Sequence, residues 1–163
     1  MPAIPIRKVR DTYAELDSPL LGFVADFSST MHSMSPTLLR AVRRAMAALR
    51  AKTDVPLIYY VNQGSALMES VADLDVDVIG VDWRTPLGEV RGVLGPGKAV
   101  QGNLDPAALF APPEELKRHV DAVLDAAGPA PGHIFNLGHG IWPETDPDAV
   151  ARLVDYVHER TGL

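Results

Sequence analysis

Short apolar runs alternate with amphipathic segments along most of this chain, and that alternation limits the possible folds more than any other feature. The apolar runs have the length of strands that are buried on both faces, as in parallel sheets. The segments between them carry apolar residues at a helical spacing of about 3.6 residues. Strand–helix units in series with short connections predict a parallel sheet with right-handed crossovers. The sequence therefore predicts an α/β fold.

Five strands are predicted, at residues 20–27, 56–61, 76–81, 99–103 and 133–137. A helical segment follows each strand, at residues 36–49, 67–74, 86–94, 116–127 and 147–157. Residues 1–19 fit neither pattern, although a helix over 7–16 is one interpretation. A closed eight-unit barrel takes about 250 residues. With 163 residues, the chain is expected to be a single domain, either a small open sheet or a partial (β/α)8 TIM barrel of about five units.

Composition excludes several classes of protein. An apolar share of 47% with 22% charged residues is typical of a globular domain. No apolar run approaches the roughly 20 residues of a membrane helix, and none follows the basic residues near Met1 as in a secretory signal. The absence of cysteine excludes disulfides and iron–sulfur clusters and fits a reducing cytosol. A net charge of −6 argues against nucleic acid as a partner. We therefore expect a cytoplasmic protein without a membrane or nucleic-acid partner.

Polar side chains stand where the predicted strands end. In parallel sheets, functional residues gather at the carboxyl ends of the strands. Asp82 follows one strand, and Gln101 and Asn103 end the next. His139 lies between two glycines after the last strand, which leaves its imidazole unscreened. Each feature also has a structural interpretation, for example an exposed histidine in a tight turn.

Two further observations bear on this edge. Asp105 is interpreted either as part of a site or as a cap for the turn that begins at Pro106. His133 begins the strand that His139 follows, so the two rings are expected at opposite strand ends. The remaining histidines are interpreted as surface residues. We therefore expect no metal site built from histidines.

Three segments in order, VDW at 81–83, QGNLDP at 101–106 and FNLGHGI at 135–141, resemble the C-terminal half of uroporphyrinogen decarboxylase. Upstream, FSS at 27–29 and the Ser35-Pro36 pair are similar to that family's strand-end motif and the helix behind it. The resemblance covers about residues 20–163. It implies a (β/α)8 barrel that decarboxylates the four acetate side chains of uroporphyrinogen to give coproporphyrinogen in haem biosynthesis. It also implies that no metal or prosthetic group takes part.

The resemblance assigns roles to individual residues. His139 matches the family's cleft histidine, which makes it the candidate catalytic residue, and Ser29 matches a serine near substrate carboxylates. Asp82, Gln101 and Asn103 match further positions of the site and are expected to bind substrate. Arg84 stands beside a matched strand end, where a cation suits a polycarboxylate.

The chain also departs from the family. The family's N-terminal half supplies two cleft arginines and an aspartate for the pyrrole nitrogens, and residues 1–19 lack their motif. The family's tyrosine-bearing loop is absent too. The chain is thus interpreted as a truncated or remodelled member that is incomplete as a lone chain. Five open units also leave two sheet edges unpaired. We therefore expect a homo-oligomer, or a partner chain that completes the barrel.

Besides a decarboxylase, two other functions remain open. The chain is either a decarboxylase completed by another subunit, or a non-catalytic half-barrel that binds a tetrapyrrole or another carboxylate or acts as a scaffold. A third possibility is the related corrinoid-dependent methyltransferase branch, whose zinc site uses histidine and cysteine. The lack of any cysteine argues against that branch.

Overall fold

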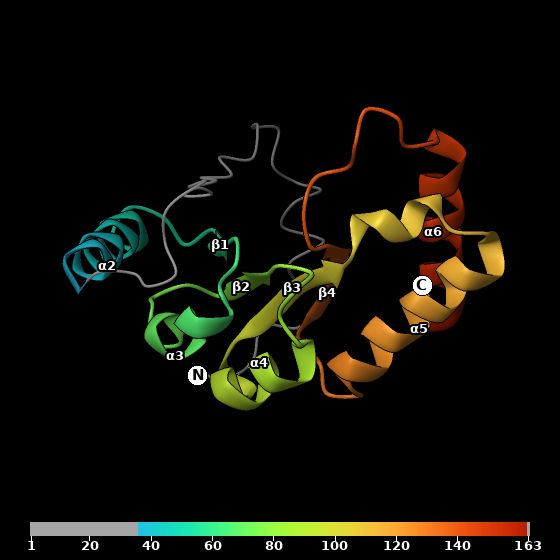
Figure 1. The fold of residues 1–163 in the computed structure, drawn as a ribbon. Coiled ribbons are helices and arrows are strands. Elements are labelled where there is room, and N and C mark those ends of the chain that lie inside the picture. Colours follow the sequence, from blue (N-terminus) through green and yellow to red (C-terminus); the bar gives the residue numbers. More distant parts are fainter. Residues whose placement is uncertain (1–35, 163) are drawn as a thin grey trace.

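The computed structural model describes residues 36–162, and in that range four strands form one sheet. The strands are β1 (Ile58–Val61), β2 (Val78–Val81), β3 (Ala99–Leu104) and β4 (His133–Leu137). They are adjacent in chain order, and every neighbouring pair is parallel. Figure 1 shows how the strands and helices are arranged. The predicted strand at 20–27 and the candidate site residue Ser29 lie outside the described residues.

A helix precedes β1, and another follows each strand. The helices are α2 (Pro36–Arg50), α3 (Met68–Val71), α4 (Leu87–Leu94), α5 (Pro113–Ala127) and α6 (Pro147–Thr161). Helices α5 and α6 pack against each other beyond β3 and β4 (Figure 1). The described residues therefore form four consecutive βα units, which confirms the predicted α/β fold with parallel units of a partial barrel.

Local sequence explains where the last helix begins and ends. The Asp146 side chain accepts a hydrogen bond from the Asp148 backbone N–H at 3.0 Å, and Pro147 takes the first helical position. At the other end, Gly162 adopts the left-handed conformation and its N–H donates to the His158 carbonyl. Asp105 also accepts from a backbone N–H, that of Ala107, at 2.9 Å. The interpretation of Asp105 as a cap is thus confirmed.

The strand register separates the two faces of the sheet. Tyr59, Ile79 and Val100 are neighbours across β1, β2 and β3, and all three are buried in one cluster with helix residues. Side chains alternate along a strand, so the adjacent row lies on the opposite face. That row, called the inner row below, contains Tyr60, Gly80, Gln101 and Ile134. None of these residues belongs to either apolar cluster described below.

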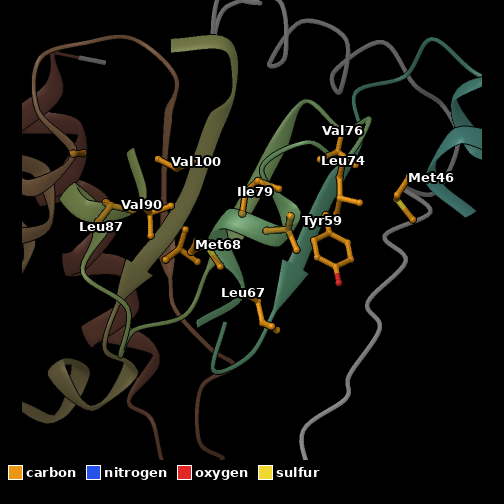
Figure 2. Packing of buried hydrophobic residues seen from close by; sticks show 13 residues of the cluster. Met46, Tyr59, Leu67, Met68, Leu74, Val76, Ile79, Leu87, Val90 and Val100 are labelled. Atoms are coloured by element: carbon orange, nitrogen blue, oxygen red, sulfur yellow. The ribbon is translucent and has the colours of Figure 1, made fainter. Parts of the chain in front are cut away.

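Two apolar clusters form the core. The first packs β1, β2 and part of β3 against α2, α3 and α4 (Figure 2); its buried members are Met46, Tyr59, Leu67, Met68, Val71, Leu74, Val76, Ile79, Val81, Leu87, Val90, Val100 and Ala127. The second packs the end of β3 against α5 and α6; its buried members are Leu104, Ala108, Leu109, Leu116, Val120, Ala149, Leu153 and Val157. The helices therefore cover one face of the sheet and leave its other face to the inner row.

Some element boundaries differ from the predicted ones. The strand expected at 76–81 begins at Val78, because Asp77 takes part in a side-chain network in front of it. The helix expected at 67–74 is one 3₁₀ turn followed by the four residues of α3. Leu74 and Val76 come after that helix yet remain buried in the first cluster. The apolar residue at position 74 therefore reflects burial in the core and not a longer helix.

Candidate functional site

The carboxyl ends of the parallel strands lie at the same edge of the sheet, called the carboxyl rim below. Asp82 directly follows β2, Asn103 is the fifth of the six residues of β3, and Gly138 with His139 follows β4. Three predicted site residues therefore belong to this rim. Gln101 lies two residues before Asn103, half-buried in the inner row of the sheet.

Asp82 is almost completely buried, with 1% of its surface exposed. Its Oδ2 accepts hydrogen bonds from the Gly64 N–H at 3.0 Å and the Thr85 hydroxyl at 2.9 Å. Its Oδ1 accepts from the Arg84 N–H at 2.9 Å. Both carboxylate oxygens are thus occupied by protein donors. The carboxylate fastens the turn after β1 to the turn after β2.

Asn103 holds the same turn from the neighbouring strand. Its side chain is 8% exposed, and Nδ2 donates to the Asp82 carbonyl at 2.9 Å and to the Thr85 carbonyl at 2.6 Å. Buried polar groups with partners stabilise a turn, whereas unpaired ones are costly. Asp82 and Asn103 therefore form one buried polar network. Direct substrate contact by either residue stays a prediction.

The network presents a cation at the rim. Arg84 is exposed, and its guanidinium carbon lies 3.9 Å from the centroid of the Trp83 ring. This geometry is a cation–π contact, which holds a guanidinium in place without neutralising it. Because Asp82 binds the Arg84 backbone N–H, the buried network fixes the main chain from which this side chain extends.

The His139 loop is anchored through Gly138. The Gly138 N–H donates to the Leu104 carbonyl at 2.7 Å, and its carbonyl accepts from the Tyr60 hydroxyl at 2.9 Å. A Cβ on Gly138 would lie 2.3 Å from the Trp83 backbone nitrogen, so only glycine fits there. Gly138 is buried, while His139 and Gly140 are exposed. The structure therefore has an exposed imidazole on a tightly held backbone.

Sequence reasoning missed three participants in this site. Gly64 and Thr85 donate to Asp82, and Tyr60 reaches Gly138 from β1. One sequence signal was available, because a glycine inside an apolar strand marks a close approach by another group. Gly80 is such a glycine, and it lies beside Tyr60 in the register.

An exposed aromatic pair stands in the loops that follow β3 and β4. Phe110 and Trp142 meet edge to face, with ring centroids 5.8 Å apart, and both rings are about half exposed. Ile141, beside Trp142, is exposed as well. An apolar surface in this position suits the flat face of a ring ligand.

His133 lies at the amino end of β4, away from His139, as predicted. Its Nε2–H donates to the Gly102 carbonyl at 2.7 Å, and burial lowers the pKa of this ring. Within residues 36–162, no group of three or more His, Asp or Glu residues is arranged to hold a metal ion. None of the helices in that range is long and apolar enough to cross a membrane.

Comparison with known proteins connects this arrangement to one family. The family model for uroporphyrinogen decarboxylase matches residues 31–160. Uroporphyrinogen decarboxylase of Streptomyces griseus is 46% identical over 143 residues, which cover 83% of this chain and 38% of the relative. The protein of the same name from Streptomyces coelicolor is 46% identical over 140 residues, covering 83% of this chain and 39% of the relative.

A solved structure agrees on the fold. A methyltransferase from Methanosarcina mazei superposes with a TM-score of 0.65 at 19% sequence identity, covering 78% of this chain and 38% of that chain. At this identity the likeness concerns the fold alone. The chain spans 38% of the length of the Streptomyces griseus relative. The matched segments include every rim residue, and the chain belongs to the uroporphyrinogen decarboxylase family.

Proposed function

We propose that this chain forms the carboxyl-rim part of a site that binds uroporphyrinogen and decarboxylates its acetate side chains. One observation carries the proposal. His139 and Arg84 are both exposed at the carboxyl rim, and hydrogen bonds hold the backbone beside each of them. Exposed groups on a fixed backbone are what a binding site requires, because little ordering remains to be done when the ligand arrives.

The chemistry of the two side chains suits a polycarboxylate. The Arg84 guanidinium is always charged and offers paired N–H donors to a carboxylate. A histidine imidazole can donate a hydrogen bond to a carboxylate or supply a proton. Together they would orient one acetate group and keep a proton source beside it.

The reaction itself needs an electron sink, which the substrate provides. A proton adds to a pyrrole ring carbon and makes an iminium-like cation. The bond between the acetate methylene and its carboxylate then breaks, carbon dioxide leaves, and the electron pair of that bond neutralises the cation. A second proton converts the resulting methylene to a methyl group, and the ring carbon loses the proton it had gained. The net change replaces the carboxylate with one proton.

One partner is part of the proposal. Arg84 is the cation that we assign to the substrate from residues 36–162, and one guanidinium is too little for a substrate with several carboxylates. We therefore place the remaining anion-binding groups on a second subunit or on chain outside that range. The chain would then act as one component of a shared cleft.

A decarboxylation assay tests the proposal. Purified protein is incubated with uroporphyrinogen in the absence of oxygen, and products with seven to four carboxylates are separated by chromatography. We expect His139→Ala and Arg84→Ala to lower turnover at least about tenfold while stability changes by less than about 1 kcal/mol. His119→Ala, which removes an exposed histidine on α5, is the matched control. Equal turnover by wild type and His139→Ala would contradict the assignment.

One observation favours a second candidate, a half-barrel that binds a tetrapyrrole without turnover. Both carboxylate oxygens of Asp82 and the amide nitrogen of Asn103 bond to protein partners, so in this structure these groups hold the turns together. Fluorescence titration with uroporphyrin, the stable oxidised form, separates the two candidates. Binding that depends on His139 without release of carbon dioxide would support the non-catalytic function.

A further inference from the structure

We propose that Tyr60 is a positioning residue for His139: its hydroxyl holds the Gly138 carbonyl and so fixes the backbone from which the imidazole extends. The proposal rests on the proposed function of His139. The hydrogen bond is 2.9 Å long and joins residues 78 positions apart in the chain. The bond connects strand β1 to the loop that follows strand β4.

The reach of this bond shows how the sheet is shaped. Strands β1 and β4 are at opposite edges of the described sheet, with β2 and β3 between them. Neighbouring strands are about 4.8 Å apart, so β1 and β4 would be about 14 Å apart in a flat sheet, far beyond one tyrosine side chain. Gly138 also bonds to Leu104 at the end of β3 and contacts the backbone of Trp83 after β2. Gly138 directly follows β4, and one residue advances the chain by only about 3.8 Å. The sheet is therefore curved and not flat, and the Tyr60 side chain crosses its concave face to reach Gly138.

Gly80 makes room for this contact. It is the register partner of Tyr60 on β2, and a Cβ built there would lie 2.9 Å from Tyr60 Cδ2 and 3.0 Å from its Cβ. The tyrosine ring therefore occupies the place that a side chain at position 80 would take. A glycine weakens an apolar strand, and here it permits the ring to lie beside β2.

His139 depends on this anchor because its own side chain has none in the described range. The ring is exposed, and within residues 36–162 it makes no hydrogen bond. Its direction is then set by the backbone at Gly138, which two hydrogen bonds restrain. Removing the Tyr60 hydroxyl removes one of the two. We expect the loop to stay attached through Leu104 but to open more often.

The test replaces the hydroxyl alone. Tyr60→Phe keeps the ring, and Tyr59→Phe is the matched control, because Tyr59 is the adjacent tyrosine and faces the buried cluster. Amide hydrogen exchange is measured at residues 138–140 without any ligand. We expect exchange about three- to tenfold faster in Tyr60→Phe, as for loss of one modest hydrogen bond, and unchanged in Tyr59→Phe. Gly80→Ala, which displaces the ring, should act in the same direction.

A double-mutant cycle links the anchor to His139. The dissociation constant for uroporphyrin is measured for wild type, Tyr60→Phe, His139→Ala and the double variant. We expect Tyr60→Phe to weaken binding about three- to tenfold in the wild-type background and to have no effect once His139 is alanine. An equal effect in both backgrounds would show that Tyr60 acts independently of the histidine and overturn the proposal.

The two readouts separate the possible failures. If wild type does not bind uroporphyrin, the proposed function fails, and the positioning role for ligand binding fails with it. If wild type binds through His139 but Tyr60→Phe changes neither exchange at 138–140 nor affinity, the function stands and Tyr60 is not a positioning residue. Faster exchange with unaltered affinity would likewise overturn the proposal, because the anchor would then serve the loop and not the ligand.

Discussion

The two ends of the sheet are held together by different chemistry. At the carboxyl rim, the buried side chains Asp82 and Asn103 bond mainly to backbone groups, at 1% and 8% exposure. At the amino end, long charged side chains join the segments in front of β1, β2 and β3, and they remain partly exposed. The first arrangement leaves the exposed side chains at the rim available for a ligand, whereas the second uses its charged groups for contacts within the protein.

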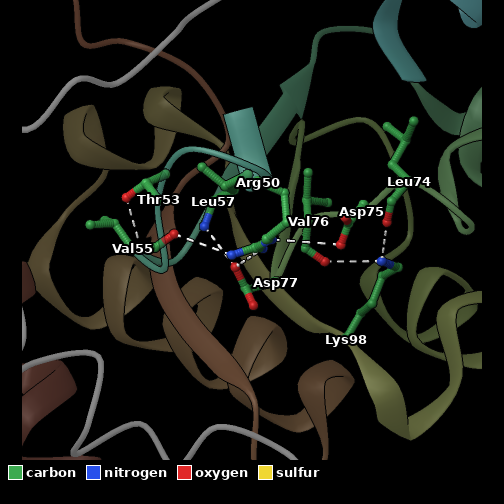
Figure 3. Close-up of polar contacts among 9 residues, drawn as sticks. All are labelled: Arg50, Thr53, Val55, Leu57, Leu74, Asp75, Val76, Asp77 and Lys98. Atoms are coloured by element: carbon green, nitrogen blue, oxygen red, sulfur yellow. Dashed lines mark hydrogen bonds and ion pairs between the residues drawn. The ribbon is translucent and has the colours of Figure 1, made fainter. Parts of the chain in front are cut away.

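The amino-end network is centred on Arg50 and Asp77 (Figure 3). Arg50 Nη2 lies 2.5 Å from Asp77 Oδ2, and the same oxygen accepts from the Leu57 N–H at 2.7 Å. Lys98 Nζ donates to the Leu74 carbonyl at 2.5 Å and to the Val76 carbonyl at 3.0 Å. Burial lowers the pKa of Lys98, against the opposite effect of the nearby aspartates.

This difference matches the division that parallel barrels usually show between the two ends of their strands. In barrel folds, the carboxyl ends of the strands carry the site and the amino ends carry stability. Here each charged group of the amino-end network forms hydrogen bonds or ion pairs with another part of the chain. At the rim, the charge of Asp82 is buried and satisfied, and the exposed groups are His139 and Arg84. The predictions below test this contrast.

The largest effect is expected at the carboxyl rim. Asp82→Ala removes three hydrogen bonds to a buried carboxylate and leaves the Gly64 and Arg84 N–H groups without that acceptor. We expect the free energy of unfolding to fall by about 3 kcal/mol, measured by urea denaturation. Asp105→Ala, which removes a single cap bond, is the control and should cost about 1 kcal/mol. Equal decreases in the free energy of unfolding for the two variants would contradict a special role of the buried Asp82 network.

A smaller effect is expected at the amino end. Asp77→Ala breaks the pair with Arg50 and the bond from the Leu57 N–H, but both charged side chains are partly exposed, at 22% and 25%. Water compensates part of the loss, so we expect a decrease of about 1.5 kcal/mol in the free energy of unfolding. In 1 M salt, the difference in the free energy of unfolding between Asp77→Ala and wild type should become smaller, because salt screens ion pairs near the surface. If Asp77→Ala lowered the free energy of unfolding more than Asp82→Ala does, the expected order of the two ends of the sheet would be wrong.

The ion pair between α2 and the segment after α3 should matter less still. Arg43 lies 2.7 Å from Asp73, and the two side chains are 42% and 64% exposed. Exposed pairs contribute little, so Arg43→Ala should change stability by no more than about 0.5 kcal/mol. A double-mutant cycle with Asp73→Ala isolates the coupling, which we expect to vanish in 1 M salt. A coupling that persists at high salt would mean that the contact is not mainly ionic.

The smallest effect concerns the pH dependence of stability. The pKa of His133 is lowered by burial from its ordinary 6.5, so the folded protein resists a proton that the unfolded chain accepts. The contribution of the neutral ring is therefore complete above about pH 6.5 and decreases as the pH falls from there toward the lowered pKa. Stability measured between pH 7.5 and 5.5 should fall more in wild type than in His133→Gln. His119→Ala, which alters an exposed ring, should retain the wild-type slope.

Much of the fold followed from local patterns. The strand at 133–137 was predicted at its observed bounds, and the capped start of the last helix followed from Asp146 and Pro147. These signals depend on neighbours in sequence. The length of α3 did not follow, because Leu74 continues the apolar spacing of Leu67 and Val71 after the helix has ended. Burial by distant helices and continuation of a helix produce the same pattern in a sequence.

The candidate site was predictable in its position but not in its connections. Strand ends and glycines indicated His139, Asp82 and Asn103, because parallel topology alone brings these positions to one edge. One partner of Asp82, Gly64, comes from the turn after β1, and the Tyr60 bond to Gly138 spans 78 positions. No local pattern contains such pairings, since they depend on how the sheet curves and which strand ends it brings together.

Helix α5 has a consequence for how the molecule loses its structure. Its Ala127 belongs to the first apolar cluster, its Val120 belongs to the second, and Val123 between them packs against both. Strand β3 is shared in the same way, through Val100 and Leu104. Without these two elements the clusters would be separate folding units. With them, damage to either cluster loosens a helix and a strand that the other one needs, so the two halves unfold as one cooperative unit.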